Sequence, residues 1–287
     1  MIARRVAANR IAICAIAARL LLLPSTALAQ GLLSGGDKPV TINADDGIEW
    51  VRDERKYVAR GNASATRDNA TVEADTLVAY YREKPEGGGQ EIFRVDANGN
   101  VRISSNQQRA TGDKAVYHVD KAVFVLVGKN LKFLSDQGTL TARDSLEYWE
   151  NRKLAVARGD AVVVQQNQRM RADIMTAHLA DAKAPAKPKR QKPAAKNAAK
   201  VPGGDQSRIR QVDAFGNVHI SLQKAIVRGD TGVYVPARGL ATICGNVRIT
   251  SGQNQLNGKC AEVNLKTGIY KLTGRAKGLV QPKGQKR

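Results

Sequence analysis

The 287-residue chain carries 46 Lys and Arg against 26 Asp and Glu, a formal net charge of +20, and 42% of its residues are hydrophobic. This hydrophobic content can supply a buried core, which excludes a chain that is disordered throughout. Aromatic residues make up only 5%. Gly, Asn, Asp, Val and Thr recur at short intervals, a composition typical of many short strands joined by polar turns.

The first thirty residues have the three parts of a secretory signal, namely a basic start, an apolar stretch over residues 11–23 and a small-residue run that ends at Ala29. Arg19 interrupts the apolar stretch. A bilayer span needs about 20 apolar residues, so an uncleaved anchor is the weaker alternative. We therefore predict a signal peptide over residues 1–29, cleaved before Gln30, and export of the mature chain.

The exported part stays strongly basic. The signal peptide contains four Arg and no acid, so the formal charge falls from +20 to +16 on cleavage. A basic exported protein meets an anionic membrane surface or an acidic ligand, or uses its charge for solubility alone. Nucleic acid is not an expected partner, because the secreted compartment offers little of it.

A repeat of about thirty residues runs along the mature chain. Its marker is the phrase Gly-Asn-Val-x-Ile, in which apolar β-branched residues alternate with Arg or His, the pattern of a half-buried strand. Gly and Asn tolerate positive φ and suit a turn or a bulge just before that strand. Copies begin at Gly99 and Gly245, a close variant at Gly216, looser ones at Gly61, Gly128 and Gly159, and a truncated one at Gly274.

Each copy has a second half that also reads as a strand. An Asp follows the opening Gly by fourteen residues, after an Ala or a Gly, as at Asp75, Asp113, Asp173 and Asp230. In the copy that opens at Gly128 the spacing is sixteen residues. Stacking such two-strand units predicts an all-β fold with one continuous apolar face.

The stretch from residue 181 to 207 breaks the repeat, because it is rich in Ala, Lys and Pro. Such a segment buries too little apolar surface to become ordered. We predict a basic disordered insertion between repeats over residues 30–180 and 208–278, followed by a polar tail over 279–287. The insertion is either a tether for anionic lipid headgroups or a tolerated surface addition.

The chain contains no recognisable catalytic constellation. Gly-x-Ser-x-Gly, His-Glu-x-x-His, a phosphate-binding glycine loop and Cys-x-x-Cys are all missing from the sequence, and its three His stand on separate repeats. We therefore expect no enzyme activity, no metal and no cofactor.

The mature chain has two cysteines, Cys244 and Cys260. A hairpin that turns near Gly252 places them on facing strands, because both are eight residues from it. In an oxidising compartment we expect a disulfide, with two free thiols as the alternative.

Four segments carry a resemblance to a known family. These are residues 39–45, 57–62, 71–77 and 110–117, which resemble the OstA-like repeats of the LptA/OstA family of lipopolysaccharide-export proteins. The likeness covers residues 39–179 and continues over 208–277. It implies a long, twisted, incompletely closed β-jellyroll of stacked antiparallel strands, located in the periplasm, whose interior holds the acyl chains of lipid A.

The resemblance also implies partners. Family members are thought to bridge an inner-membrane LptC-like component and an outer-membrane LptD-like component by edge-strand pairing, and to associate head to tail. A sheet with unpaired edges is a template for strand addition, which is compatible with such joining.

The candidate ligand site is the apolar face of the repeats. Acyl chains gain about 0.8 kcal/mol for each buried methylene, so no special polar residue is required. Basic residues at the rim, namely Arg102, Lys132 and Arg248, are candidates for the phosphates of lipid A. An ordinary sheet core that never meets a ligand is the alternative at each position. The predicted lining residues are Val101, Ile103, Tyr117, Leu131, Phe133, Leu146, Tyr148, Val162, Val164, Val218, Ile220, Tyr234, Val247 and Ile249.

A second hypothesis is a parallel β-helix, since repeats of this length suit that fold too. It would make the protein an adhesin or a polysaccharide-binding or polysaccharide-processing protein. The repeats lack clustered carboxylates at matching positions, which argues against a glycoside hydrolase.

Overall fold

The computed structural model describes residues 40–84, 89–105, 108–136, 138–166, 168–180, 209–264 and 267–279. The predicted signal peptide and the predicted insertion over 181–207 lie outside the described residues. The predicted tail over 279–287 also lies outside them, apart from Leu279, which belongs to the last strand.

Eighteen strands within the described ranges form one antiparallel sheet. A short 3-10 turn, η1 (Glu150–Arg152), joins β10 to β11. The strands are β1 (Thr41–Asn43), β2 (Ile48–Val51), β3 (Lys56–Arg67), β4 (Ala70–Glu83), β5 (Gln90–Ser105), β6 (Gln108–His118), β7 (Val123–Val127), β8 (Leu131–Ser135), β9 (Gly138–Ala142), β10 (Ser145–Trp149), β11 (Leu154–Gln165), β12 (Gln168–Leu179), β13 (Ile209–Ser221), β14 (Ile226–Val235), β15 (Leu240–Ser251), β16 (Asn254–Asn264), β17 (Ile269–Thr273) and β18 (Lys277–Leu279).

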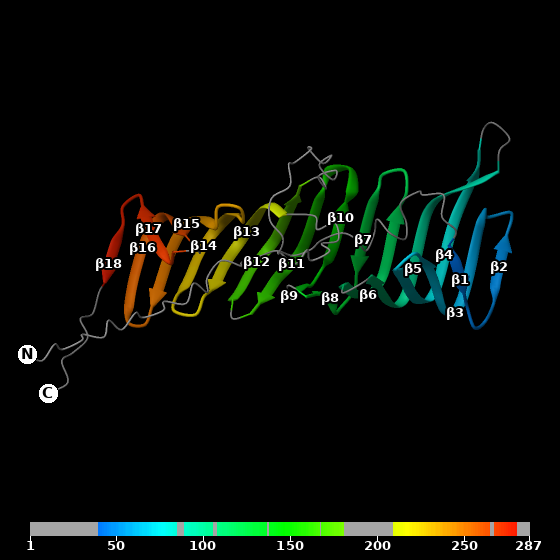
Figure 1. Ribbon diagram of the computed structural model, residues 1–287, viewed down its shortest axis with the longest axis horizontal. Helices are drawn as coiled ribbons and strands as arrows, with labels where there is room; N and C mark the ends of the chain where they lie inside the picture. Colours follow the sequence, from blue (N-terminus) through cyan, green and yellow to red (C-terminus); the bar gives the residue numbers. More distant parts are fainter. Residues whose placement is uncertain are drawn as a thin grey trace, which may run out of the picture.

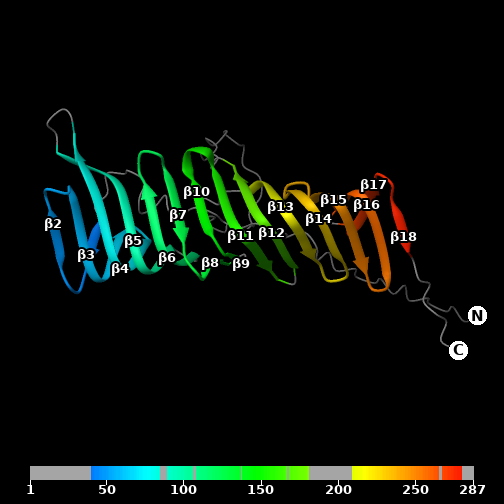
Figure 2. The ribbon, with the colours of Figure 1, turned by 180° about the vertical axis from the view of Figure 1, so that it is seen from behind.

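The sheet is a meander of strand positions, in which each position pairs with the next one along the chain. Four strand positions are divided in two, as β1 with β2, β7 with β8, β9 with β10, and β17 with β18; each half pairs with a different part of the neighbouring strand. The described strands thus occupy fourteen successive positions. Figures 1 and 2 show the resulting elongated array, with β2 at one end and β18 at the other.

A line of β-bulges, here called the seam, crosses the sheet along its length. In β3, Gly61 and Asn62 together lie opposite the single residue Asp75 of β4. The Gly-Asn or Gly-Asp pairs of β5, β11 and β13 likewise lie opposite one Asp on the next strand. Two residues against one is the count of a β-bulge, which bends and twists a strand. The repeated phrase in the sequence therefore places the bulges of β3, β5, β11, β13 and β15 at the same level of the sheet.

The bend divides the sheet into two walls. The first wall contains β2, β7, β10 and β17 with the halves of the long strands that pair with them, and the second wall contains β1, β8, β9 and β18 with the other halves. A single sheet would leave both faces in water. Yet Ala59 on the first wall and Ala63 on the second are at most 4% exposed. The two walls therefore cover each other, and the core lies between them.

The predicted all-β jellyroll of stacked antiparallel strands is confirmed. The parallel β-helix alternative is wrong, because successive strands of each repeat pair antiparallel through short hairpins instead of stacking in parallel coils.

Candidate functional site

The candidate site is the interior between the walls, here called the trough. Two rows of side chains from each wall line it along the whole sheet. Nearest the seam, the rows are rich in small residues, such as Ala97 and Ala115 on the first wall and Ala63 and Ala161 on the second. Small side chains allow the two walls to approach closely at the seam. At several positions a larger side chain lies farther from the seam, as Tyr117 does beyond Ala115 and Tyr234 beyond Gly232.

Within the trough, aromatic side chains occur in the row of the first wall that lies farther from the seam. Tyr117, Phe124 and Tyr148 lie directly opposite one another across β6, β7 and β10. Tyr117 and Tyr148 are 3% and 6% exposed, and Tyr234 farther along is 3% exposed. Burial raises the pKa of Tyr234 to about 12. The phenol of Tyr234 therefore stays neutral at physiological pH. Each of these tyrosines contributes an apolar ring with one polar tip.

Aliphatic residues form the corresponding row of the second wall. Ile103, Ile220 and Ile249 are 3%, 7% and 3% exposed, and Phe133 packs against the same core. The two rows on each wall that lie nearest the seam contain no charged residue among the described strands. The trough is thus apolar over its entire described length.

The second wall ends in a polar row at its free rim. Ser105 lies opposite Gln108, and Gln165 lies opposite Gln168. Ser105 is 2% exposed and Gln165 is 7% exposed. Among the described residues, the Oγ atom of Ser105 and the Oε1 atom of Gln168 are buried without a hydrogen-bond partner. A buried polar atom without a partner costs free energy, so this rim is suited to a ligand that offers hydroxyl or amide groups.

Between β12 and β15 the trough is filled by its own side chains. At β12 to β15 the remaining cavity has a volume of about 10 Å³, room for about one water molecule. It lies between Met170, Val218 and Ile243. An acyl chain therefore cannot enter this part of the trough without separation of the walls at the rim.

Most of the predicted lining residues do face the trough. Twelve of the fourteen lie on the inner faces of the walls, namely Val101, Ile103, Tyr117, Leu131, Phe133, Leu146, Tyr148, Val218, Ile220, Tyr234, Val247 and Ile249.

The prediction for Val162 and Val164 is wrong. Both lie on the outer face, where Val164 is 42% exposed, and their neighbours Ala161 and Val163 are 0% and 4% exposed. Three consecutive Val in this copy hide the alternation. The residue two positions after Gly159, Ala161, faces inward, as does the residue two positions after Gly99.

The predicted rim position of Arg102, Lys132 and Arg248 is also wrong. They alternate with the inner residues next to the seam, so they point outward from the second wall, and they are exposed. Phosphates of a lipid held in the trough would lie on the other side of that wall.

Several trough residues were not predicted. The residue just before each repeat Asp is small and faces inward, as Ala74, Gly112, Ala172 and Gly229 do. The regular Ala or Gly at this position was the available signal. Leu126, at 0% exposure, lies on a divided strand where the repeat phrase is weakest.

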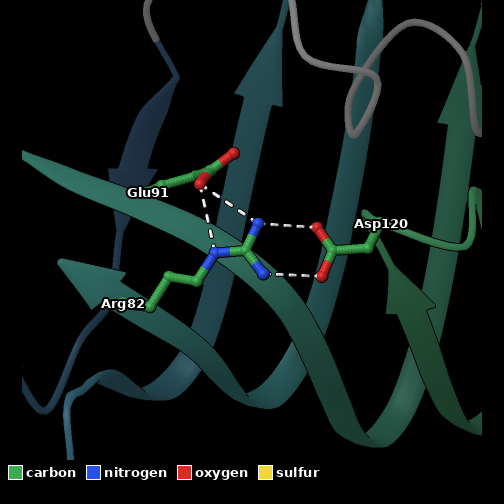
Figure 3. Close-up of polar contacts among 3 residues, drawn as sticks. All are labelled: Arg82, Glu91 and Asp120. Carbon is green, nitrogen blue, oxygen red and sulfur yellow. Dashed lines mark hydrogen bonds and ion pairs between the residues drawn. The ribbon is translucent and has the colours of Figure 1, made fainter. Parts of the chain in front are cut away.

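An ion-paired cluster holds the first-wall rim near β4. Arg82 of β4 donates hydrogen bonds to Asp120 at 2.8 and 2.9 Å and to Glu91 of β5 at 3.1 Å (Figure 3). The pKa of Arg82 is raised chiefly by its hydrogen bonds to Asp120 and also by its hydrogen bonding to Glu91. The cluster is exposed and links β4, β5 and the turn after β6, a structural role rather than a ligand site.

The cysteines lie directly opposite each other on β15 and β16 and form a disulfide. The bond closes a loop with a sequence separation of 16 residues, for which the chain-entropy model gives about 3 kcal/mol at most. It lies at the seam, next to the bulge at Gly245 and Asn246.

The described residues contain no group of three or more His, Cys, Asp or Glu side chains that could hold a metal ion. None of their helical segments is long and apolar enough to cross a membrane.

Three comparisons relate the chain to known proteins. An uncharacterized protein of Rhizobium meliloti (strain 1021) is 28% identical over an alignment of 120 residues that covers 38% of this chain and 64% of that protein. The structure of LptH, described as the LptA homologous periplasmic component of the conserved lipopolysaccharide transport device from Pseudomonas aeruginosa, covers 86% of this chain and 97% of LptH, with 11% identity and a TM-score of 0.20.

The family model described as "LptA/(LptD N-terminal domain) LPS transport protein" matches residues 41–144 and again residues 141–269. Together the two matches cover well over half of the chain, and they include every strand from β1 to β16. The chain therefore belongs to the LptA/(LptD N-terminal domain) family of LPS transport proteins.

Proposed function

We propose that this protein carries lipopolysaccharide across the periplasm and holds the acyl chains of lipid A between its two walls. The observation that carries the proposal is the uncharged trough, which runs without interruption from β3 to β16 in a chain of this family. Each methylene buried there contributes about 0.8 kcal/mol. Wall separation would replace contacts between the walls with contacts to acyl chains, so the ligand substitutes for part of the core.

The polar rim of the second wall supports an amphipathic ligand. With acyl chains between the apolar rows, the sugar part of lipid A would lie near the buried polar groups of Ser105 and Gln168. Hydroxyl groups there would supply the missing hydrogen bonds. The predicted partners, cleaved signal peptide and periplasmic location remain part of this proposal.

Bridging between membranes is the second part of the proposal, and an internal joint supports it. The halves β7 and β8 pair with β10 and β9 respectively, so both walls continue across the point where the two family matches meet. The ends of the molecule have divided strands of the same kind, β1 with β2 and β17 with β18. The same joint would be repeated if β17 and β18 paired with β2 and β1 of a second copy. It would also be repeated if an end of the molecule paired with an LptC-like or LptD-like partner.

The inner face at the first end is uncovered, as such a joint requires. Ile48 and Trp50 of β2 share the parity of the trough residues Ala59 and Tyr57, opposite which they lie. They are 52% and 47% exposed, and Ile42 of β1 is 38% exposed. A following molecule would bury these side chains and extend the trough.

Photocrosslinking in cells tests the ligand and the trough together. A benzophenone amino acid replaces Phe133 or Tyr148, which face the trough, or Phe215, which is 48% exposed on the outer face of β13. We expect lipopolysaccharide adducts from the first two positions and at least tenfold less from Phe215, because only trough positions reach acyl chains. Equal adduct yields from all three positions, or none from the trough positions in a folded protein, would contradict the proposal.

A further inference from the structure

The outer face of the second wall carries a row of cations with few acidic partners. Arg171 of β12 lies opposite His219 of β13, His219 opposite Arg228 of β14, and Arg228 opposite Arg248 of β15. Side chains in such positions are neighbours on one face, and like charges placed opposite one another are destabilising. We call Arg169, Arg171, His219, Arg228 and Arg248 the basic face; all but the half-buried His219 are exposed.

The nearby acids form a single ion pair with this face among the described residues. Asp160 forms an ion pair with Arg171. The seam residues Asp173 and Asp230 accept hydrogen bonds from Asn217 and Asn246. Within the described ranges, Arg169, Arg228 and Arg248 have no ion-pair partner.

The titration of His219 reports the same excess of positive charge. Its pKa is lowered, first by burial and then by repulsion from Arg228, Arg169 and Arg171. The ring is therefore neutral at physiological pH, because protonation would add a further positive charge to an already repulsive cluster.

The outer face of the first wall is different. There the acids are distributed among the bases, with ion pairs between Arg94 and Asp96 and between Arg158 and Glu147. The contrast means that the basic face is a local feature of one wall and does not simply follow from the charge of the whole chain.

Exposed apolar side chains lie among the cations. Val164 lies opposite Arg169 and is 42% exposed, and Ile226, on the same face of β14, is 39% exposed. An alternation of aliphatic and cationic side chains on one face suits the boundary between headgroups and acyl chains of an anionic bilayer. A soluble anion or an acidic protein would need the cations alone.

We propose that the basic face, over β12 to β15, docks the protein against the surface of an anionic lipid bilayer. Arg169, Arg228 and Arg248 contact the phosphates of the headgroups, and Val164 and Ile226 enter the boundary region. Separation of the walls at the rims would open the trough, and this face does not form a rim, so docking leaves the rims accessible. This inference does not depend on the ligand of the trough.

Vesicle binding by the mature full-length protein tests the charge. The probe is a phosphatidylcholine vesicle with one quarter phosphatidylglycerol, compared with pure phosphatidylcholine. We expect the double variant Arg228→Gln/Arg248→Gln to bind the anionic vesicles about 25-fold more weakly, from the contribution of each basic residue near such a surface. Its control, Lys114→Gln/Lys271→Gln, removes the same charge from exposed positions on the first wall. It should stay within about threefold of the parent.

The orientation of the protein on the bilayer is tested with two positions on one strand. Ile226 and Val233 of β14 are 39% and 40% exposed and lie on the outer faces of different walls. With brominated lipids, the added fluorescence of Ile226→Trp should be quenched, and that of Val233→Trp should not. Equal loss of binding in both double variants, equal quenching of both tryptophans, or release by inorganic phosphate but not by chloride at equal ionic strength would overturn the proposal.

Discussion

At the scale of single residues, the seam depends on contacts between an aspartate and a glycine. Gly99 and Asn100 both have positive φ, +79° and +49°. Asn100 donates hydrogen bonds to Asp75 at 2.9 and 3.1 Å. A side chain at position 99 would overlap the Asp75 carboxylate. Glycine is therefore required there for its backbone conformation and for the space that the carboxylate occupies.

Replacing Gly99 with Ala should separate these two requirements. Gly252 provides the control, because it also has positive φ but has no neighbour within 4 Å of an added Cβ. Gly252→Ala should lower the free energy of unfolding by about 1 kcal/mol, the cost of the left-handed conformation. Gly99→Ala should lower it by about 3 kcal/mol, because the Asp75 carboxylate must also move. Urea denaturation measures both values.

A rescue variant completes this test. Asp75→Ala/Gly99→Ala removes the carboxylate, leaves only the Cβ atom of residue 75 at 2.9 Å from the added Cβ, and should regain part of the lost stability relative to Gly99→Ala alone. Equal losses in Gly99→Ala and Gly252→Ala would mean that the carboxylate contact has no role in holding the seam.

At the scale of strands, β11 shows where the sequence pattern misleads. Its segment Ala161-Val162-Val163-Val164 has no polar residue to mark the outer face. The bulge at Gly159 and Asp160 fixes which residues face inward, since each bulge places the second residue after the Gly in the trough. Counting from the bulge predicts the face in β5, β11, β13 and β15 alike.

Neighbouring valines of β11 offer a direct check on this assignment. Val163→Asp places a carboxylate among the trough side chains and should lower the free energy of unfolding by more than 3 kcal/mol. Val164→Asp, on the 42% exposed side chain, should change it by at most about 0.5 kcal/mol. Thermal unfolding followed by circular dichroism distinguishes the two. A larger loss of unfolding free energy in Val164→Asp than in Val163→Asp would show that the inner and outer faces of β11 are assigned the wrong way round.

Local patterns predicted the strands, the antiparallel all-β class and most of the inner positions, because alternation and Gly-Asn bulges act over a few residues. The two walls could not be predicted in this way. They arise because the bulges of neighbouring strands lie in line, a relation between residues such as Asn62 and Asp75 that only the register shows. The basic face likewise depends on register, since Arg171, Arg228 and Arg248 are far apart in sequence.

At the scale of the whole molecule, the chain is two family units in tandem. The two matches, residues 41–144 and 141–269, each begin with a divided strand. At the first, the amides of Asp45 and Asp46 donate to the carbonyl oxygens of Gly61 and Arg60; at the second, those of Arg143 and Asp144 donate to Gly159 and Arg158. The repeated geometry indicates that a divided strand is the standard start of a unit.

Proline in the edge strand β1 tests whether this start can also receive another molecule. Successive backbone amides of a strand point to opposite sides. One of the two residues Thr41 and Ile42 therefore donates its amide hydrogen toward β3, and the other donates toward the open edge. We expect one of Thr41→Pro and Ile42→Pro to keep the parent melting temperature and to lose end-to-end crosslinking in concentrated protein. Ile42→Ala, which keeps its amide, is the control. Crosslinking that persists in both proline variants would favour a carrier that works alone.

The meander also determines how the molecule bears force. Its hydrogen bonds run perpendicular to the strands and therefore along the length of the array, which at about 4.8 Å per strand extends roughly 60 Å. Tension between the ends would load these bonds one strand pair at a time, so the sheet would open like a zipper from its edges. The disulfide between β15 and β16 would stop that opening after one strand position, that of β17 and β18, has separated from the C-terminal edge, whereas the described residues at the β1 edge have no such bond.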